Sequence, residues 1–304
     1  MNSHFLAWCL STPWALQPER MGAYAAVLAR RYVAQMNVGG MDEDDHGAPL
    51  KPEAAVKKTG GRSGATAVIQ ICGPIVQRSN MINICDGGTS TQAISNSLRE
   101  ANADDTIDSI ILEIDSPGGS VYGVAEAAAE IRASGKPVTA IANSLAASAG
   151  YWLGSAAKEF FVTPGGEVGS IGVWMAHEDW SKALEDAGVK TTLISAGKYK
   201  VEGNPYEPLG DEAKGFLQGR TDDYYGAFTR DVAKGRNTTV DAVRSGMGQG
   251  RVLGASQAKD AGMVDGIMTF DQVVRHVQRG AAPQGRRAAS EQTQRRLALL
   301  SLQG

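Results

Sequence analysis

The chain has 304 residues, of which 42% are hydrophobic and 21% charged, and its formal net charge is −3. This composition is typical of a globular protein with a sizeable core, while the small charge and the lack of an apolar run of about 20 residues argue against nucleic acid or a membrane as partner. Its three cysteines, Cys9, Cys72 and Cys85, form no CxxC pair, which disfavours a disulfide framework or a zinc site and favours reduced thiols.

The N-terminal part of the chain predicts an arm followed by a linker. Residues 1–36 lack the basic region of a signal peptide, and residues 18–36 have the pattern of an amphipathic helix with Pro18 in its first turn. Residues 37–64 are rich in Gly, Pro and charge without a sustained period, which predicts a flexible linker. The acidic cluster at residues 42–46 is interpreted as solvated linker, because nothing there fixes the geometry of metal ligands.

From residue 65 onward, short β-rich runs alternate with helical stretches. We expect strands at 65–73, 107–115, 137–143 and 159–164, and helices at 90–104, 120–135, 146–157 and 208–236. A shorter helical unit at 239–265 ends near a strand-like segment, and the polar residues 280–304 predict a disordered tail. The alternation predicts one α/β domain at 65–279, with a mostly parallel sheet and flanking helices.

Two stretches lie where the carboxyl ends of such strands would meet, the usual place for a ligand in a parallel α/β sheet. The first is DSPGGSV, residues 115–121, in which Gly118 and Gly119 permit close backbone approach. Its backbone N–H groups could face an anion, although a plain strand-to-helix turn would use the same residues. A phosphate loop is not favoured, because neither GxxxxGK[ST] nor GxGxxG is present.

The second stretch is ANSLAASAGYW, residues 142–152. We expect Ser148 in the first turn of a helix, where its hydroxyl would face the same sheet edge as the glycine turn and act as the nucleophile. The N–H of Ala149 would join those of the glycine turn in an oxyanion hole. Ser144 is expected to precede the helix as an N-cap, and Ser155 to pack two turns inside it. The surroundings of Ser148 are not GxSxG, so the nucleophile turn of the α/β-hydrolases is not predicted.

A nucleophilic serine needs a base, and the local pattern leaves its identity open. Of the four histidines, His177 alone lies away from the arm, the linker and the C-terminal end, and a loop or surface role suits it better than catalysis. Lys198 and Lys200 lie in the Gly- and Pro-containing stretch SAGKYKVEGNPYEP, where an exposed lysine pair is ordinarily solvated charge.

Taken in order, SPGGSV, AASAGYW, GSIGV and SAGKYK resemble the signal peptide peptidase A family of serine proteases, whose fold is related to Clp protease and crotonase. Residues 170–209 resemble more narrowly the capsid assembly (head maturation) proteases of lambda-type tailed phages. The resemblance spans roughly residues 65–268. It implies a serine–lysine dyad of Ser148 and Lys200, with Ser170 of GSIGV hydrogen-bonding the lysine, and no metal or cofactor.

The resemblance also implies a mechanism and a setting. Burial against apolar walls lowers the pKa of a lysine and lets it accept a proton, and Trp152, Trp174 and Tyr199 are candidates for such walls, although core packing suits each equally well. The substrates and partners implied are the portal, scaffold and major capsid proteins of a prohead assembling in the bacterial host cytoplasm. Self-association into a ring-like oligomer is expected as well.

Three other interpretations remain open at this point. A crotonase-like acyl-CoA enzyme would share the oxyanion hole without needing Ser148. A non-catalytic head-assembly component would keep the fold with an inert serine. A Clp-like triad would use Ser148, His177 and an aspartate.

Overall fold

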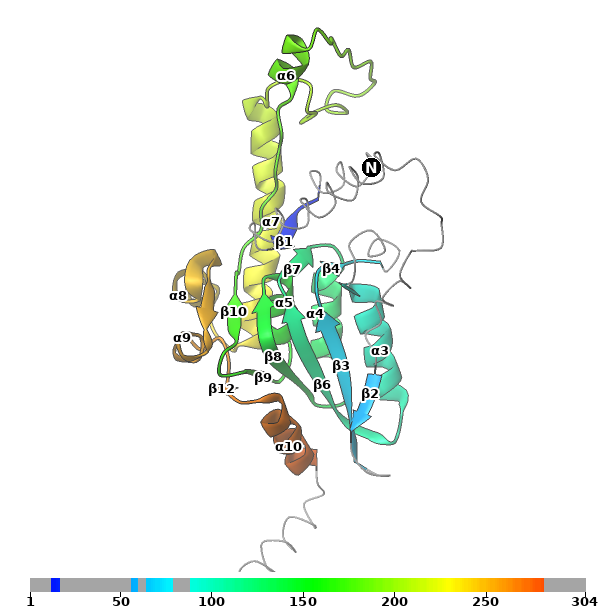
Figure 1. The fold of residues 1–304 in the computed structure, drawn as a ribbon, viewed down its shortest axis with the longest axis vertical. Coiled ribbons are helices and arrows are strands. Elements are labelled where there is room, and N and C mark those ends of the chain that lie inside the picture. The colour runs from blue at the N-terminus through cyan, green and yellow to red at the C-terminus, as the bar shows by residue number, and fades with distance from the viewer. Residues whose placement is uncertain (1–11, 17–55, 60–63, 79–87, 282–304) are drawn as a thin grey trace, which may run out of the picture.

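A computed structural model describes residues 12–16, 56–59, 64–78 and 88–281 (Figure 1). Its strands are β1 (Trp14–Leu16), β2 (Val56–Thr59), β3 (Ala65–Cys72), β4 (Ile75–Val76), β5 (Thr89–Ser90), β6 (Ile107–Ser116), β7 (Gly118–Ser120), β8 (Val138–Ala147), β9 (Glu159–Val162), β10 (Glu167–Gly169), β11 (Val252–Gly254) and β12 (Gly266–Ile267). Its helices are α3 (Thr91–Ala103), α4 (Val124–Arg132), α5 (Ala149–Ser155), α6 (Ser181–Asp186), α7 (Asp211–Gly235), α8 (Val240–Gly246), α9 (Ala255–Asp260) and α10 (Phe270–Ala281), with a short 3₁₀ turn, η2, at Gly248–Gly250.

The main sheet has the strand order β11-β10-β8-β6-β3-β2, and β9 and β12 continue it beside the first half of β8. The inner pairs β3–β6, β6–β8, β8–β9 and β8–β10 are parallel, whereas β2 and β11 pair antiparallel to their neighbours. Parallel strands need crossover helices, and α3, α4 and α5 supply them. The α/β prediction with a mostly parallel sheet and flanking helices is therefore confirmed.

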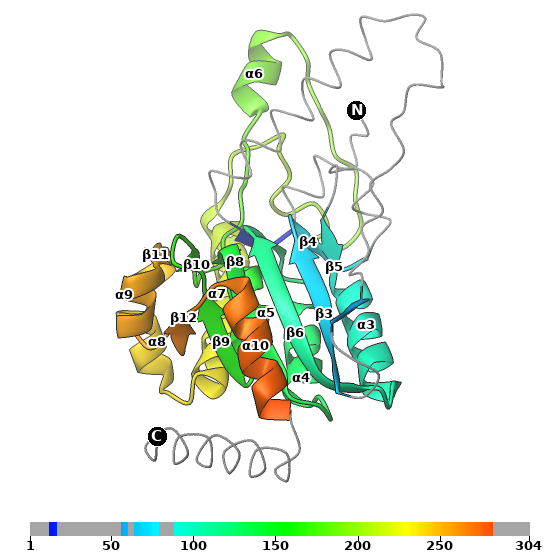
Figure 2. The same cartoon turned by 60° about the horizontal axis from the view of Figure 1, so that its bottom comes forward.

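The two faces of the sheet are covered by different helices (Figure 2). On one face, Val273 and Val277 of α10 pack against Val68, Ile111 and Ile141 of the central strands. On the other face α3, α4, α5 and α7 enclose the larger core. Burial on both faces explains why the central strands read as almost continuous apolar runs.

A smaller sheet with the strand order β1-β7-β4-β5 lies beyond the carboxyl end of β6. Gly119 of β7 stands at its centre, in register with Ala15 of β1 on one side and Ile75 of β4 on the other. A Cβ on Gly119 would lie 1.8 Å from the Ile75 carbonyl oxygen, so the second glycine of the SPGG turn allows these strands to approach closely.

Several expected boundaries were wrong. The strand expected at 137–143 continues to Ala147, so Ser144 is an exposed strand residue and Ser148 takes the N-cap position of α5. The helical unit expected at 239–265 is broken into α8, η2, β11 and α9. Part of the expected linker, Val56–Thr59, forms an edge strand on β3, and α10 extends to Ala281. The helix expected at 18–36 lies outside the described residues, as do 37–55 and 60–63 of the linker and 282–304 of the tail.

Residues 174–210, which include α6, and the N-terminal half of α7 project beyond the sheet in Figure 1. The projection carries most of the large apolar side chains that are exposed among the described residues: Trp180, Val189, Leu193, Ile194, Tyr199, Tyr206 and Phe216. Ile194 is 96% exposed. So many exposed large apolar side chains on one segment indicate an interaction surface.

The C-terminal end of α7 is tied to the sheet by a paired carboxylate. Asp265 accepts hydrogen bonds from both terminal nitrogens of Arg236, at 2.9 and 2.8 Å, and from the N–H of Phe160 at 2.7 Å. Burial alone would raise the pKa of the Asp265 carboxyl, but these hydrogen bonds outweigh it and hold the pKa below its ordinary value.

Asp265→Asn is therefore expected to lower the melting temperature at neutral pH. A lowered pKa in the folded state gives stability that is present above the unfolded pKa and is lost as the pH falls through the folded value. The difference from the parent should thus shrink below about pH 4. Thermal denaturation followed by circular dichroism from pH 7 to pH 3 measures it, with the exposed Asp260→Asn as control. A difference independent of pH would contradict this role of the carboxylate.

Candidate active site

Three neighbouring parallel strands, β6, β8 and β10, end at the same edge of the main sheet. Their register sets Ser116 beside Ala146, and Gly169 beside Ala147. The residues that follow are the SPGG turn after β6, Ser148 after β8 and Ser170 after β10. Stretches separated by some 20 to 50 residues in the sequence thus converge at one edge, as the sequence predicted for the glycine turn and Ser148.

Ser148 adopts a strained backbone conformation between β8 and α5. Its φ is 54° and its ψ −115°, a region that non-glycine residues rarely occupy and that costs on the order of 1–3 kcal/mol. Two backbone hydrogen bonds hold it: its N–H donates to the Gly169 carbonyl at 2.7 Å, and its own carbonyl accepts from the Trp152 N–H at 2.8 Å. Strain retained in this way is typical of a residue whose direction matters for function.

The hydroxyl of Ser148 is nearly free of tight partners. The residue is 1% exposed, and its Oγ makes a long hydrogen bond, 3.5 Å, to the Gly172 carbonyl. No such bond joins Ser148 to a base among the described residues. A hollow of about 370 Å³ opens beside Gly172, lined also by Ile171, Val173 and residues of α7 and α8.

Ser170 repeats the geometry of Ser148 on the neighbouring strand. Its φ is 55°, its N–H donates to the Arg251 carbonyl at 2.7 Å, and it is 8% exposed. Because Gly169 and Ala147 are paired, the two serines stand side by side where their strands end. Ser170 is therefore placed near Ser148, as its predicted role beside the dyad requires, although no hydrogen bond joins the two serines.

The glycine turn lies against the same serine. Gly118 has a φ of +98°, and a Cβ on it would lie 2.9 Å from Ser148 Cβ and 2.1 Å from the Ala15 carbonyl oxygen. Its N–H donates to Ser116 Oγ at 3.1 Å, and that hydroxyl in turn donates to the Gly73 carbonyl at 2.6 Å. Gly118 thus lets the backbone of the turn lie close to Ser148. Its N–H, which was expected in the oxyanion hole, is already hydrogen-bonded to Ser116.

The helix behind the nucleophile is fixed through Trp152. The indole ring stacks on Phe228 of α7 with 4.5 Å between ring centroids, and its N–H donates to Asp231 at 2.8 Å. Asp231 is paired with Arg132 of α4 at 2.7 Å. Trp152 therefore anchors α5 in the core. Of the two roles considered for it, core packing is the one observed, rather than apolar contact with Lys200.

Lys200 is an exposed turn residue. It belongs to segment 174–210, which projects beyond the sheet in Figure 1. Nearby, Lys198 donates to the Tyr199 hydroxyl at 2.6 Å, and that hydroxyl donates to Glu212 at 2.7 Å. Tyr199 is 52% exposed and packs no wall around Lys200. Within one copy of the chain, the structure brings together Ser148, Ser170, Ala149 and the two glycines, but not Lys200.

His177 is placed at the base of the projection and is only partly buried. Its Nε2 lies 3.1 Å from the Asn204 carbonyl oxygen, within the same segment. No hydrogen bond connects it to Ser148 in the part of the chain that the structure describes. The geometry therefore lends no support to a Clp-like triad.

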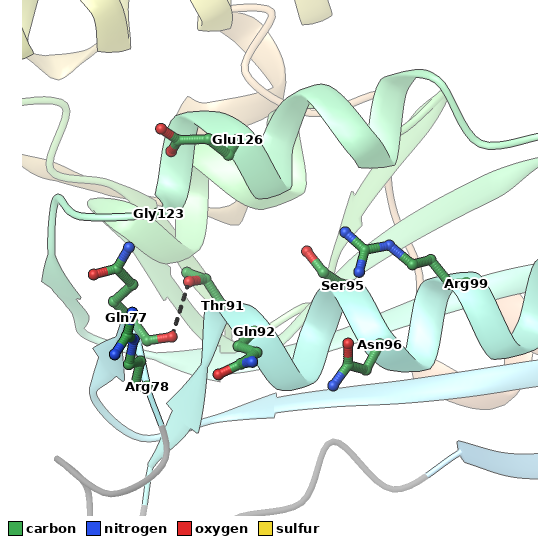
Figure 3. Close-up of a pocket in the computed structure, with 9 residues that line it drawn as sticks. All are labelled: Gln77, Arg78, Thr91, Gln92, Ser95, Asn96, Arg99, Gly123 and Glu126. Carbon is green, nitrogen blue, oxygen red and sulfur yellow. Dashed lines mark hydrogen bonds between the residues drawn. The ribbon is translucent and has the colours of Figure 1, made fainter.

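A separate hollow of about 510 Å³ lies between α3 and α4 (Figure 3). Its lining is polar: Gln77, Arg78, Thr91, Gln92, Ser95, Asn96, Arg99, Gly123 and Glu126. None of the predicted catalytic residues reaches it. Over the described ranges, no three His, Cys, Asp or Glu side chains gather as metal ligands would, and no helix is long and apolar enough to cross a membrane.

Gly118→Ala is expected to damage this site, because the new methyl group would meet backbone and Ser148 at contact distances that real Cβ atoms do not adopt. The positive φ adds strain for any L side chain. We expect at least a tenfold loss in the labelling rate of Ser148 by a fluorophosphonate, and a lower melting temperature. Gly165→Ala is the control, because a Cβ there meets nothing within 4 Å. If both variants show the same labelling rate and melting temperature, Gly118 is not needed for close packing against Ser148.

The chain is similar in sequence to several known proteins. Residues 130–283 match the model of Peptidase family S49. The chain is 32% identical to the "Capsid assembly protease C" of Escherichia phage lambda and 30% identical to the "Head-tail preconnector protein GP5" of Enterobacteria phage P21, over 89% and 99% of its own length. It spans 64% of each of those two relatives. It is also 32% identical to a "Putative signal peptide peptidase SppA" of Enterococcus faecium, over 56% of the chain and 50% of that protein.

Proposed function

Since the chain belongs to peptidase family S49 and is related to a phage capsid assembly protease, we propose that it is a serine endopeptidase in which Ser148 attacks the peptide carbonyl. The observation that carries this proposal is the strained, buried Ser148 at the meeting point of three strand ends, with its hydroxyl free of a tight acceptor. Strain is kept at this residue by the hydrogen bond to Gly169, which aims the side chain.

In the proposed mechanism the oxyanion is held by backbone N–H groups. Ala149 is the first residue of α5, so its N–H has no acceptor within the helix and is free to donate. Gly119 of β7 is the proposed second donor, since the N–H of Gly118 is taken by Ser116. Its N–H faces Ala15 of the paired strand β1 and would have to be released to a substrate carbonyl. Two such donors, placed before the reaction, stabilise the charge that develops on the carbonyl oxygen.

Lys200 is the proposed base, and it acts from a neighbouring copy of the chain. A lysine takes the serine proton only as the neutral amine, a form favoured where apolar groups surround it. In a single copy Lys200 is exposed and lies in the projection that carries Ile194, Trp180 and Tyr199. Docking of this apolar projection onto another copy would bury it and bring Lys200 and Ser148 together. The dyad would then form only in a self-assembled ring, with Ser170 orienting the lysine.

The proposed substrates are proteins of an assembling phage head. The relatives' names refer to capsid assembly and to the head–tail preconnector, which motivates portal, scaffold and major capsid proteins as candidates inside the prohead of an infected bacterium. A non-catalytic assembly component of the same fold is the alternative, but a strained, buried serine whose hydroxyl has no tight acceptor favours catalysis.

The test is mass spectrometry of recombinant portal, scaffold and capsid proteins of the same phage, incubated with the chain. Discrete new peptide termini that are absent with Ser148→Ala support the proposal. If the head proteins stay intact under conditions where the chain self-assembles, the peptidase proposal is wrong and the chain is a non-catalytic assembly component. If cleavage persists in Ser148→Ala, the chain is a peptidase but Ser148 is not its nucleophile.

A further inference from the structure

Strand β1 is inserted between two other segments directly in front of Ser148. It pairs antiparallel with β7, and on its opposite edge Trp14 forms a bridge with Trp174. The Trp14 N–H donates to the Trp174 carbonyl at 2.9 Å, and the Trp174 N–H donates back to the Trp14 carbonyl at 3.0 Å. The indole N–H of Trp174 also donates to the Leu16 carbonyl at 2.7 Å. A short segment is thus held along both of its edges.

The backbone of β1 alternates between its two neighbours, as an added strand does. The Pro13 carbonyl accepts from the Val121 N–H at 3.2 Å, while Trp14 faces the other way. Ala15 stands in register with Gly119, so its carbonyl is directed toward the glycine turn. This is the arrangement by which many proteins bind an extended peptide along a sheet edge.

The Ala15 carbonyl reaches the nucleophile. Its oxygen lies 2.1 Å, and Ser148 Cβ 2.9 Å, from the point where a Cβ on Gly118 would be, which bounds their separation to about 5 Å. Ala15 is completely buried, and Trp14 and Leu16 are nearly so. A peptide carbonyl therefore occupies the place in front of Ser148 and beside Gly119 that the proposed mechanism reserves for the substrate.

From these contacts we propose that residues 13–16 occupy the peptide-binding cleft of the enzyme and compete with substrates for it. The proposal rests on the proposed function, since it takes Ser148 as the nucleophile. The cleft lies between β7 and Trp174, and its occupant is this chain's own N-terminal segment. The protease is closed while β1 is in place, and it opens to other peptides when β1 is withdrawn. Because Ala15 is buried against a glycine strand, the cleft takes a small side chain at that position.

A reversible cross-link tests the proposal on the full-length chain. The neighbouring pairs Pro13–Val121 and Ala15–Gly119 face each other through hydrogen-bonding groups, so Trp14 and Ser120 form a non-hydrogen-bonded pair. Cα atoms in such a pair lie about 4.5 Å apart, within disulfide range. Trp14→Cys with Ser120→Cys, in a Ser148→Ala chain whose other cysteines are serine, would lock β1 in the cleft when oxidised and release it when reduced.

The measured quantity is the affinity for a fluorescein-labelled peptide with the sequence of residues 10–19, followed by fluorescence anisotropy. We expect the reduced form to bind at least tenfold more tightly than the oxidised form, and a peptide with phenylalanine at the position of Ala15 to bind at least tenfold more weakly. The cysteine-free Ser148→Ala chain, treated in the same two ways, controls for the redox treatment.

Equal affinity in the two redox states, no binding in either state, or failure of the disulfide to form would each overturn the proposal. The readout needs no catalysis, so it is independent of the outcome for Ser148. The cross-linked chain could bind the peptide only when reduced while the chain with Ser148 intact cleaves no substrate. That result would support β1 as the occupant of the cleft and would refute the proposed peptidase function.

Discussion

Ser148→Ala is expected to abolish peptidase activity, with a loss of about 10⁴-fold or more in kcat, while the fold remains intact. The substitution removes one hydroxyl, whose hydrogen bond to the Gly172 carbonyl is long, at 3.5 Å, and therefore contributes little stability. The two backbone hydrogen bonds that hold residue 148 do not involve the side chain. The measurement pairs cleavage of a fluorogenic peptide with the melting temperature, which should shift by no more than a few degrees.

Ser155→Ala is the matched control, because it removes the same atom from a second serine, the last residue of the helix that Ser148 precedes. Ser155 is completely buried, and its Oγ donates to the Trp152 carbonyl at 2.8 Å. We expect the opposite pattern from it: about 1 kcal/mol less stability and nearly full activity. If Ser148→Ala keeps its activity, or if both variants lose activity to the same extent, the nucleophile assignment is wrong.

Much of the sheet edge could be predicted from the sequence, because it depends on local patterns. Apolar runs of strand length, each followed by a helical period, predict β3, β6 and β8 one after another along the chain. Parallel strands of this kind end at a common edge of the sheet. These patterns alone predict the SPGG turn beside Ser148. Ser170 was assigned only through the family resemblance, although the end of β10 beside β8 would have signalled it.

Other features could not be predicted, because they depend on contacts between distant segments. The three residues of β1 are too few to show a period, and their partners on β7 and at Trp174 lie over 100 residues further along the chain. The boundary at Ser148 was misplaced for a related reason. AASAG suits a helix by propensity, but pairing of Ala146 and Ala147 with β10 extends the strand to the nucleophile.

Lys200→Met is expected to be as inactive as Ser148→Ala, with a loss of several orders of magnitude in kcat, because a member of the dyad is removed. Lys200→Arg should be equally inactive, since a guanidinium stays protonated at any usable pH and cannot take the serine proton. Both variants should fold normally, because residue 200 is exposed in a single copy. His177→Ala is the control and should keep most of its rate, since the contact of His177 is with Asn204 in its own segment.

Mixing the two inactive chains tests whether the lysine comes from a neighbour. Lys200 lies in an exposed projection while Ser148 is buried in the body of the chain, so a dyad between copies would be restored wherever an intact lysine meets an intact serine. Ser148→Ala mixed with Lys200→Met before assembly is therefore expected to recover a substantial fraction, roughly a quarter, of the parental activity, if the copies associate at random. The check is peptide cleavage by the mixture against each variant alone, with size-exclusion chromatography to confirm co-assembly. A co-assembled but inactive mixture would place both members of the dyad in one copy. Activity of Lys200→Met alone, together with loss in His177→Ala, would replace the lysine by a histidine base.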